Sequence, residues 1–344
     1  MMKAKRIRNG AQLAASSAAM LMLAACGGGG GSSGDAGGGG GAAAINSSNG
    51  TAVASRVYSV ANVLYSTGEN AAQVVDVKSA GTPSRDVQFN LAEFALRKVL
   101  DFEADRKAGA KLAGKAVETY ADTCSLGGSF SEVWNDADNS GSLSTGDTAS
   151  ITFTNCTEEL GIRLNGTMSL SNLLATGSSV TPSRSVGATF NFVNLQMSVD
   201  DASATVHGDM ALQAAITNFA PYTYDLSING KNLAVADGSW QEALASYSAS
   251  VFIDFTAGTY AYGVAGTVSG TAFPVAITMG TPRTLAGNIG AYPTTGVTTA
   301  TASDGTAARL TVNSATSVSI DLDADADGIF ESSETMTWAQ LTAL

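Results

Sequence analysis

The most regular pattern in the sequence is an alternation of apolar and polar residues that begins near residue 160. A period of two places successive side chains on opposite faces of a β-strand, so each alternating segment is predicted to be a strand with one buried face. Residues from about 160 to 344 are therefore predicted to form an antiparallel sheet with one solvated face. The pattern is clearest in residues 162–170, 206–212, 222–230, 260–264 and 318–322.

A glycine recurs within this alternating part of the chain, in similar surroundings each time. It is Gly166 in Leu-Asn-Gly-Thr-Met, Gly208 in Val-His-Gly-Asp-Met and Gly270 in Val-Ser-Gly-Thr-Ala. A glycine inside a strand commonly marks a bulge or a sharp bend. The predicted fold is therefore mainly β, with long strands in a curved antiparallel sheet or an open half-barrel.

One segment, residues 87–108, has a helical period instead. Its apolar residues recur at spacings of three and four, charged residues fill the positions between them, and Gly109 supplies a stop signal. The mixed charges favour packing on the sheet over lying on a membrane. One amphipathic α-helix is therefore predicted to cover the sheet.

The N-terminus has the pattern of an export signal. Four basic side chains in residues 1–8 precede an Ala- and Leu-rich run at 11–25, which is too short to span a bilayer comfortably. The run ends in Leu23-Ala24-Ala25-Cys26, which resembles the lipobox of bacterial lipoproteins. The resemblance implies that residues 1–25 are a cleaved signal peptide and that Cys26 carries acyl chains such as palmitate, which anchor the protein to a membrane. Gly27 is not the aspartate that retains enterobacterial lipoproteins in the inner membrane, so the outer membrane is favoured, with its periplasmic and surface faces both open.

A stretch rich in Gly and Ser follows the predicted lipidation site. Such a composition cannot bury apolar surface, so residues 26–52 are predicted to be a flexible tether. No second polar linker interrupts the remaining chain, and residues 53–344 are predicted to form a single β-rich domain.

The charge of the predicted mature chain excludes one class of partner. The sequence has 18 basic and 30 acidic side chains, and removal of residues 1–25 takes away four basic ones and no acid. The 14 basic and 30 acidic side chains that remain give a net charge of −16. Nucleic-acid binding depends on neutralising phosphates and is therefore not expected, whereas cation binding is.

Two cysteines, Cys124 and Cys156, remain after lipidation of the third. In an exported protein a disulfide between them is expected. Closing that loop would stabilise the fold by roughly 3–4 kcal/mol through the entropy of the unfolded chain.

The most informative local sequence lies near the C-terminus. Counting from Asp323, acidic residues fall at positions 1, 3, 5, 9 and 12, with Gly328 at position 6, which resembles the twelve-residue EF-hand calcium loop. In that resemblance Ile329 contributes its backbone carbonyl, Glu331 binds directly or through water, and Glu334 closes the site with both oxygens. The full implied ligand set is Asp323, Asp325, Asp327, Ile329, Glu331 and Glu334.

A second, weaker copy of the loop lies between Cys124 and Cys156, in a predicted hairpin at about 124–156. It has Gly141 at position 6 but fewer carboxylates and a shorter closing residue, which predicts weaker calcium binding. Its candidate ligands are Asp136, Asp138, Ser140, Ser142, Ser144 and Asp147.

Strand-like sequences flank both loops, so the helix movement of calcium sensors has no counterpart. Two structural calcium ions of modest affinity are therefore predicted. Residues typical of catalysis are few: His207 is the single histidine, sits in a predicted strand and has no G-x-S-x-G motif beside it. The sequence does not indicate an enzyme.

The layout as a whole runs from the lipobox and tether to the terminal loop before Thr337-Trp338-Ala339-Gln340-Leu341. In this layout the chain is similar to outer-membrane lipoproteins of Gram-negative proteobacteria with EF-hand-like loops, a resemblance that implies location and architecture and no activity. Two hypotheses follow. The first is a calcium-stapled structural or interaction module that contacts other envelope proteins. The second is a carrier or chaperone for a lipid or other apolar ligand, held in the concave face of the sheet. A filled core would favour the module and a deep apolar cavity the carrier.

Overall fold

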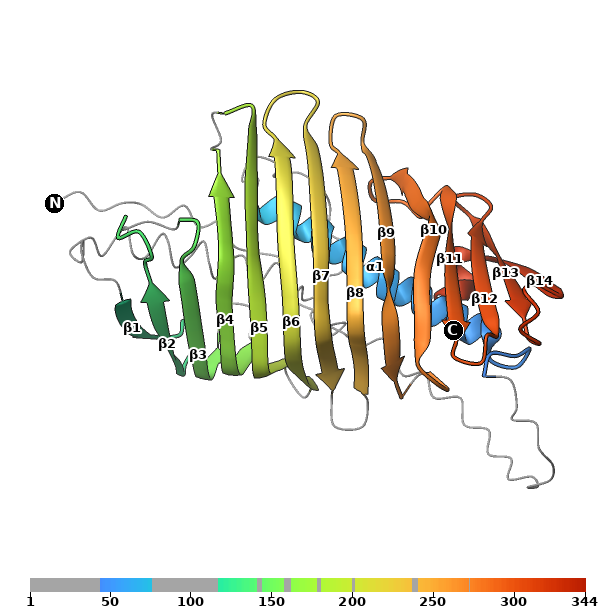
Figure 1. Ribbon diagram of the computed structural model, residues 1–344, viewed down its shortest axis with the longest axis horizontal. Helices are drawn as coiled ribbons and strands as arrows, with labels where there is room; N and C mark the ends of the chain where they lie inside the picture. Colours follow the sequence, from blue (N-terminus) through green and yellow to red (C-terminus); the bar gives the residue numbers. More distant parts are fainter. Residues whose placement is uncertain are drawn as a thin grey trace, which may run out of the picture.

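The computed structural model describes residues 44–75, 117–140, 144–157, 162–177, 181–199, 202–236, 241–271 and 273–344. Within them the protein is mainly β, as predicted: 14 antiparallel strands follow one another in sequence order in a single open sheet (Figure 1). The predicted signal peptide 1–25, the lipidation site Cys26 and the predicted helix 87–108 lie outside the described residues.

The sheet is built from hairpins and begins earlier than predicted, at residue 117 rather than near 160. The longest strands lie near its middle and the shorter ones toward its two edges. The strands are β1 Val117–Thr123, β2 Ser129–Asn135, β3 Thr148–Thr157, β4 Arg163–Thr176, β5 Ser183–Val199, β6 Ala202–Thr217, β7 Thr223–Ala236, β8 Gln241–Asp254, β9 Thr259–Gly270, β10 Ile277–Asn288, β11 Thr295–Ala302, β12 Ala307–Val312, β13 Ser317–Asp323 and β14 Ser332–Thr337.

Alternation along the strands produces one buried and one solvated face. In β7 and β8, for example, buried residues such as Leu226 and Val251 alternate with exposed ones such as Ser227 and Ser250. The two-residue period read from the sequence therefore corresponds to the real faces of the sheet.

The predicted glycine bulges are present at two of the three positions. Gly166 and Gly208 have φ values of +110° and +117°, and a Cβ at either would collide with the carbonyl oxygen of Asn194 or Asn232 on the next strand. Register shifts lie beside both glycines. Gly270 differs, because it ends β9 and pairs regularly with Glu242.

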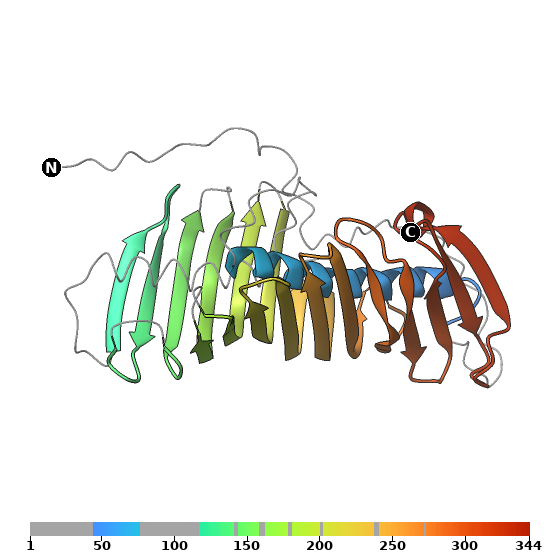
Figure 2. The same ribbon diagram turned by 90° about the horizontal axis from the view of Figure 1, so that it is seen from above.

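The solvent-shielded face is covered from β7 to β13 by α1, Gly50–Val75, a helix that the sequence analysis did not predict. Figure 2 shows α1 running along this face, and its contacts extend from β7 to β13. Its buried residues recur at helical spacing, with Val53, Val57, Ala61 and Leu64 on the side that meets the sheet. Among the described residues, no helix has both the length and the apolar character needed to cross a bilayer.

The predicted tether, 26–52, is too long at its C-terminal end. The Ile45 side chain is 0 % exposed, and its backbone N–H donates to Thr306 Oγ1 at 3.0 Å. The N–H of Ala44 donates to Asp304 Oδ2 at 2.8 Å. Residues 44–52 are therefore part of the folded domain, because they supply apolar surface and hydrogen bonds that the Gly/Ser composition concealed.

Several contacts fix α1 to the sheet and to the C-terminus. Arg56 forms a partly buried ion pair with Glu242 of β8, and Ser55 Oγ donates to the carbonyl of Leu341 at 2.8 Å. Burial raises the pKa of the Glu242 carboxyl, and the charge of Arg56 offsets part of that rise. Tyr58 packs on Trp338, which begins the short helix α3, Trp338–Leu341, with ring centroids 4.8 Å apart. Side chains therefore fill the space between α1 and the strands beneath it.

Candidate metal centres

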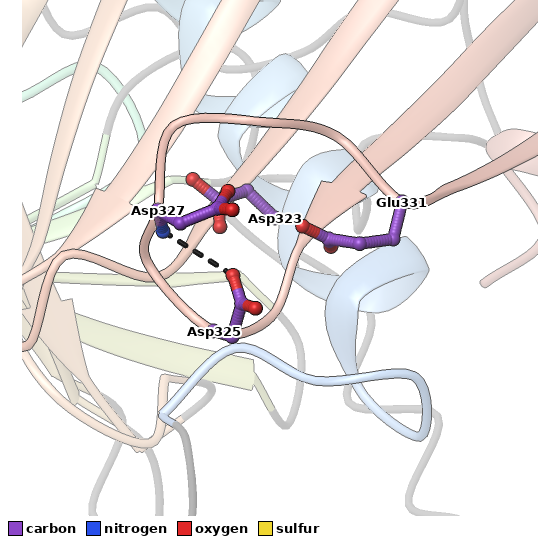
Figure 3. Close-up of side chains that lie close together, drawn as sticks. All are labelled: Asp323, Asp325, Asp327 and Glu331. Carbon is purple, nitrogen blue, oxygen red and sulfur yellow. Dashed lines mark hydrogen bonds between the residues drawn. The ribbon is translucent and has the colours of Figure 1, made fainter.

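The connection between β13 and β14 brings four carboxylates together. Asp323, Asp325, Asp327 and Glu331 each offer an oxygen, and these oxygens lie within 4.8 Å of one another. Figure 3 shows the four side chains directed toward the inside of the loop. Asp323 is buried and the other three are exposed, so the group forms a partly exposed, strongly acidic cluster.

Backbone hydrogen bonds hold these carboxylates in the loop. Asp323 accepts from Ala326 N at 2.8 Å and from Gly328 N at 3.0 Å, and Asp325 accepts from the N–H of Asp327 at 3.2 Å. Ala326 and Gly328 have φ values of +64° and +85°, which turn the chain sharply and leave these N–H groups pointing inward. The glycine at position 6 therefore performs the role that the sequence suggested.

The structure places Glu334 outside this group. It lies exposed in β14, opposite Ile320, and accepts a hydrogen bond from Thr51 Oγ1 at 3.5 Å. The reason is the register of β14, which begins immediately after Glu331, so the chain is already extended at position 12. Glu331 is instead the last carboxylate of the group, while the exposed Ile329 donates its N–H to Asp327 Oδ1 at 2.7 Å.

The hairpin loop between β2 and β3 gathers a smaller group, Asp136, Asp138 and Asp147, with the same 4.8 Å spread of oxygens. Asp136 and Asp147 are buried and Asp138 is exposed. The candidate ligand Ser142 lies outside the described residues, which omit 141–143.

Backbone donors occupy both oxygens of Asp147. They accept from Ala137 N at 2.9 Å and from Ser144 N at 2.8 Å. The Ser140 N–H donates to Asp136 and to Asp138, at 3.1 and 3.0 Å. Hydrogen bonds from the Ser140 hydroxyl and N–H hold the pKa of the Asp138 carboxyl below its ordinary value.

The two loops share a local geometry beyond their sequence pattern. Position 4 is Asn139 in the hairpin loop and Ala326 in the C-terminal loop, and both have positive φ, +54° and +64°. In both loops the acid at position 3 accepts from the N–H at position 5. The resemblance between the two sequences therefore corresponds to one repeated backbone form.

Each loop is braced differently. The predicted disulfide Cys124–Cys156 is present, with 5.3 Å between the Cα atoms, and it lies at the base of the β2–β3 hairpin whose tip is the acidic loop. The C-terminal loop packs on the turn after β11, where a Cβ on Gly305 would lie 3.0 Å from that of Ala326. Gly50 of α1 lies against Leu322, directly before the loop. The sequence contained no signal for these contacts because their partners are far apart in the chain.

Carboxylate oxygens without histidine or thiolate ligands suit hard divalent cations and do not suit zinc. Both groups could therefore hold a metal ion. The single histidine, His207, lies exposed on β6, remote in sequence from both loops and outside both acidic groups. Comparison with known proteins gives no match to a family model, to a curated protein or to a solved structure.

Proposed function

We propose that this chain is an exported lipoprotein, anchored in the outer membrane through Cys26, whose β domain is stapled by two calcium ions and serves a structural or interaction role. The lipobox and the basic, apolar N-terminus support the anchor. The observation that carries the calcium assignment is the repeated loop, which twice gathers inward-facing carboxylates around one backbone form.

Calcium is favoured over magnesium by the way the oxygens are supplied. Calcium accepts six to eight oxygen ligands in irregular geometry, whereas magnesium demands a near-ideal octahedron. Three or four carboxylates from one turn, completed by carbonyls and water, suit the larger ion. Without a cation the four carboxylates of the C-terminal loop would repel one another.

The position of the loops supports a stapling role. One lies between β2 and β3, near one lateral edge of the sheet, and the other between β13 and β14, at the opposite edge (Figure 1). Strands near an open edge have fewer neighbours and are the first to separate. An ion at each hairpin tip would hold the two strands of that hairpin together, at each end of the sheet.

The test is thermal unfolding of the mature chain with excess calcium, with excess magnesium and with EDTA. At a free calcium concentration ten times the Kd, one bound ion adds about 1.4 kcal/mol to the free energy of unfolding, so two ions add about 3 kcal/mol. The midpoint should therefore rise by roughly 4–6 °C in calcium relative to EDTA, and by much less in magnesium. Equal midpoints in calcium and EDTA would contradict the proposal that calcium stabilises the domain.

The anchor is tested separately. Cells expressing the chain and fed an alkyne analogue of palmitate should label it, and the label should vanish in Cys26→Ser while export persists. Labelling that survives Cys26→Ser would contradict the anchor and leave the calcium assignment untouched.

The filled face beneath α1 supports the module over the lipid carrier. Tyr65 of α1 stacks on Tyr262 of β9 with ring centroids 4.7 Å apart, and Val57 and Ala61 are almost fully buried. A carrier would need this space for its ligand. Organic extraction of the purified protein should therefore release no stoichiometric lipid beyond the anchor.

A further inference from the structure

The solvated face of the sheet, opposite α1, carries a groove of about 460 Å³ across β6 to β10. Its floor consists of four small side chains on neighbouring strands, Ala215, Ser227, Ser250 and Ala261. Five strands about 4.8 Å apart span roughly 19 Å, which sets the length of the groove across the sheet. The groove is therefore long and shallow, with a floor that leaves room for a ligand.

Polar side chains in and beside this floor have hydrogen-bonding capacity that the protein does not use. Within the part of the chain that the structure describes, the side chains of Gln213, Asp225, Ser227, Ser250 and Thr284 form no hydrogen bond to another residue. They supply carboxylate, amide and hydroxyl groups that face the same groove.

Elsewhere on the same face, some polar side chains pair with each other across strands. Asn191 donates to Asp209, and the hydroxyls of Ser319 and Thr335 lie 3.0 Å apart. Arg309 donates to Asp321 at 3.0 Å. In the groove, unlike in these pairs, the polar groups converge without pairing.

An aromatic ring completes the groove. Phe252, 38 % exposed, stands between Asp225 and Ala261, its partners on the two neighbouring strands. Two more exposed aromatic residues, Tyr222 and Phe255, lie at the adjoining turns, where Phe255 N donates to the carbonyl of Tyr222 at 3.0 Å. The groove therefore offers an apolar ring face beside its polar groups.

We propose that this groove binds a neutral oligosaccharide. A sugar ring presents apolar C–H faces to an aromatic side chain and hydroxyls to carboxylate, amide and hydroxyl groups, which is the combination found here. No lining residue is basic, and Asp225 together with the acidic protein would repel phosphate or carboxylate ligands. An extended peptide could not add as a strand, because β6 to β10 are paired on both sides. The groove is too open to enclose an acyl chain.

The experiment is saturation-transfer NMR on the chain from residue 26 onward, carrying Cys26→Ser, with a panel of maltotetraose, cellotetraose, xylotetraose and the tetramer of N-acetylglucosamine. At least one probe should receive saturation at millimolar concentration. Phe252→Ala and Asp225→Ala should each weaken its binding at least tenfold, and Ser250→Tyr, which fills the groove from an exposed position, should abolish it. Tyr120→Ala, which removes an exposed ring from edge strand β1, should leave binding unchanged.

Two results would overturn the proposal. One is the absence of saturation transfer to every probe. The other is binding that survives both Phe252→Ala and Ser250→Tyr, which would place the sugar elsewhere. Unchanged thermal midpoints in the variants establish that any loss of binding is local. Calcium plays no part in this groove. A failure of the sugar-binding proposal therefore leaves the calcium proposal untouched, and a failure of the calcium proposal leaves the sugar-binding proposal untouched.

Discussion

The two acidic loops have the same backbone form but differ in how much of that form depends on an ion. In the hairpin loop, two of the three carboxylates are buried, and both oxygens of Asp147 accept backbone hydrogen bonds. In the C-terminal loop three of the four carboxylates are exposed, and charge is concentrated more strongly. The hairpin loop has fewer charges, more buried carboxylates and a disulfide at its base, so the C-terminal loop is the one expected to depend more on calcium.

This difference shows that a shared ligand pattern does not imply a shared energetic role. Backbone donors already stabilise the buried carboxylates of the hairpin loop, so an ion adds to an existing structure. The C-terminal loop also has backbone donors, but it gathers four carboxylates, three of them exposed, so their mutual repulsion is larger and an ion there would offset a larger cost. The predictions below separate the two cases.

The largest effect is expected from the brace of the hairpin loop. The double variant Cys124→Ala with Cys156→Ala should lose about 3–4 kcal/mol of unfolding free energy, because the unfolded chain regains the entropy of the open loop. Urea unfolding measures this loss. Calcium binding at the hairpin loop should weaken, while binding at the C-terminal loop should not change. Equal weakening at both loops would mean that they are not independent.

A second pair of variants compares the carboxylates directly. Both oxygens of the buried Asp147 carboxylate accept backbone hydrogen bonds, and Asp147→Asn replaces one of these oxygens by an NH2 group. The change should therefore cost about 1–3 kcal/mol of unfolding free energy with or without calcium. Asp325→Asn keeps an oxygen for the Asp327 N–H. It should cost about 1.4 kcal/mol in calcium and should slightly stabilise the protein in EDTA, because it removes one of four mutually repelling charges. Thermal unfolding in both buffers measures the four values. A calcium-independent loss in Asp325→Asn would reverse the assignment of roles.

A third pair tests which acid closes the C-terminal loop. Glu331→Gln should weaken calcium binding there by about tenfold, equivalent to 1.4 kcal/mol, because its carboxylate lies in the four-oxygen group. Glu334→Gln is the matched control, since Glu334 lies in β14 against Thr51, and it should change affinity less than twofold. Isothermal titration gives both affinities. The opposite ranking would restore the twelve-residue loop expected from the sequence.

The sequence predicts periodic and local features well in this protein. Alternation defined the buried face of the sheet, two glycines marked real bulges, and the spacing of acids identified both loops. Features that depend on distant contacts were missed. Helix α1 has a helical apolar stripe, but it follows a Gly/Ser-rich stretch whose composition suggested a tether. The register of β14, which removes Glu334 from the site, depends on its pairing with β13 and is not encoded in the loop itself.

The smallest expected effect concerns the helix that packs beside the C-terminal loop. Burial raises the pKa of Glu242 in the folded protein above its ordinary value near 4.5. The folded state therefore binds this proton more tightly, so its contribution to stability is complete below that value and is lost as pH rises through the raised pKa. Glu242→Gln should flatten this decline in urea midpoints measured upward from pH 4.5. An unchanged slope would show that Arg56 cancels the effect of burial.

The most direct test of the central claim is native mass spectrometry of the chain from residue 26 onward with Cys26→Ser, in calcium and after EDTA. The account predicts two calcium-sized mass increments in calcium and none after EDTA. One increment should remain in Asp323→Ala and one in Asp136→Ala, since each variant lacks a single loop's first ligand. No increment at millimolar calcium, or two increments that persist in both variants, would contradict the assignment of the ions to these loops.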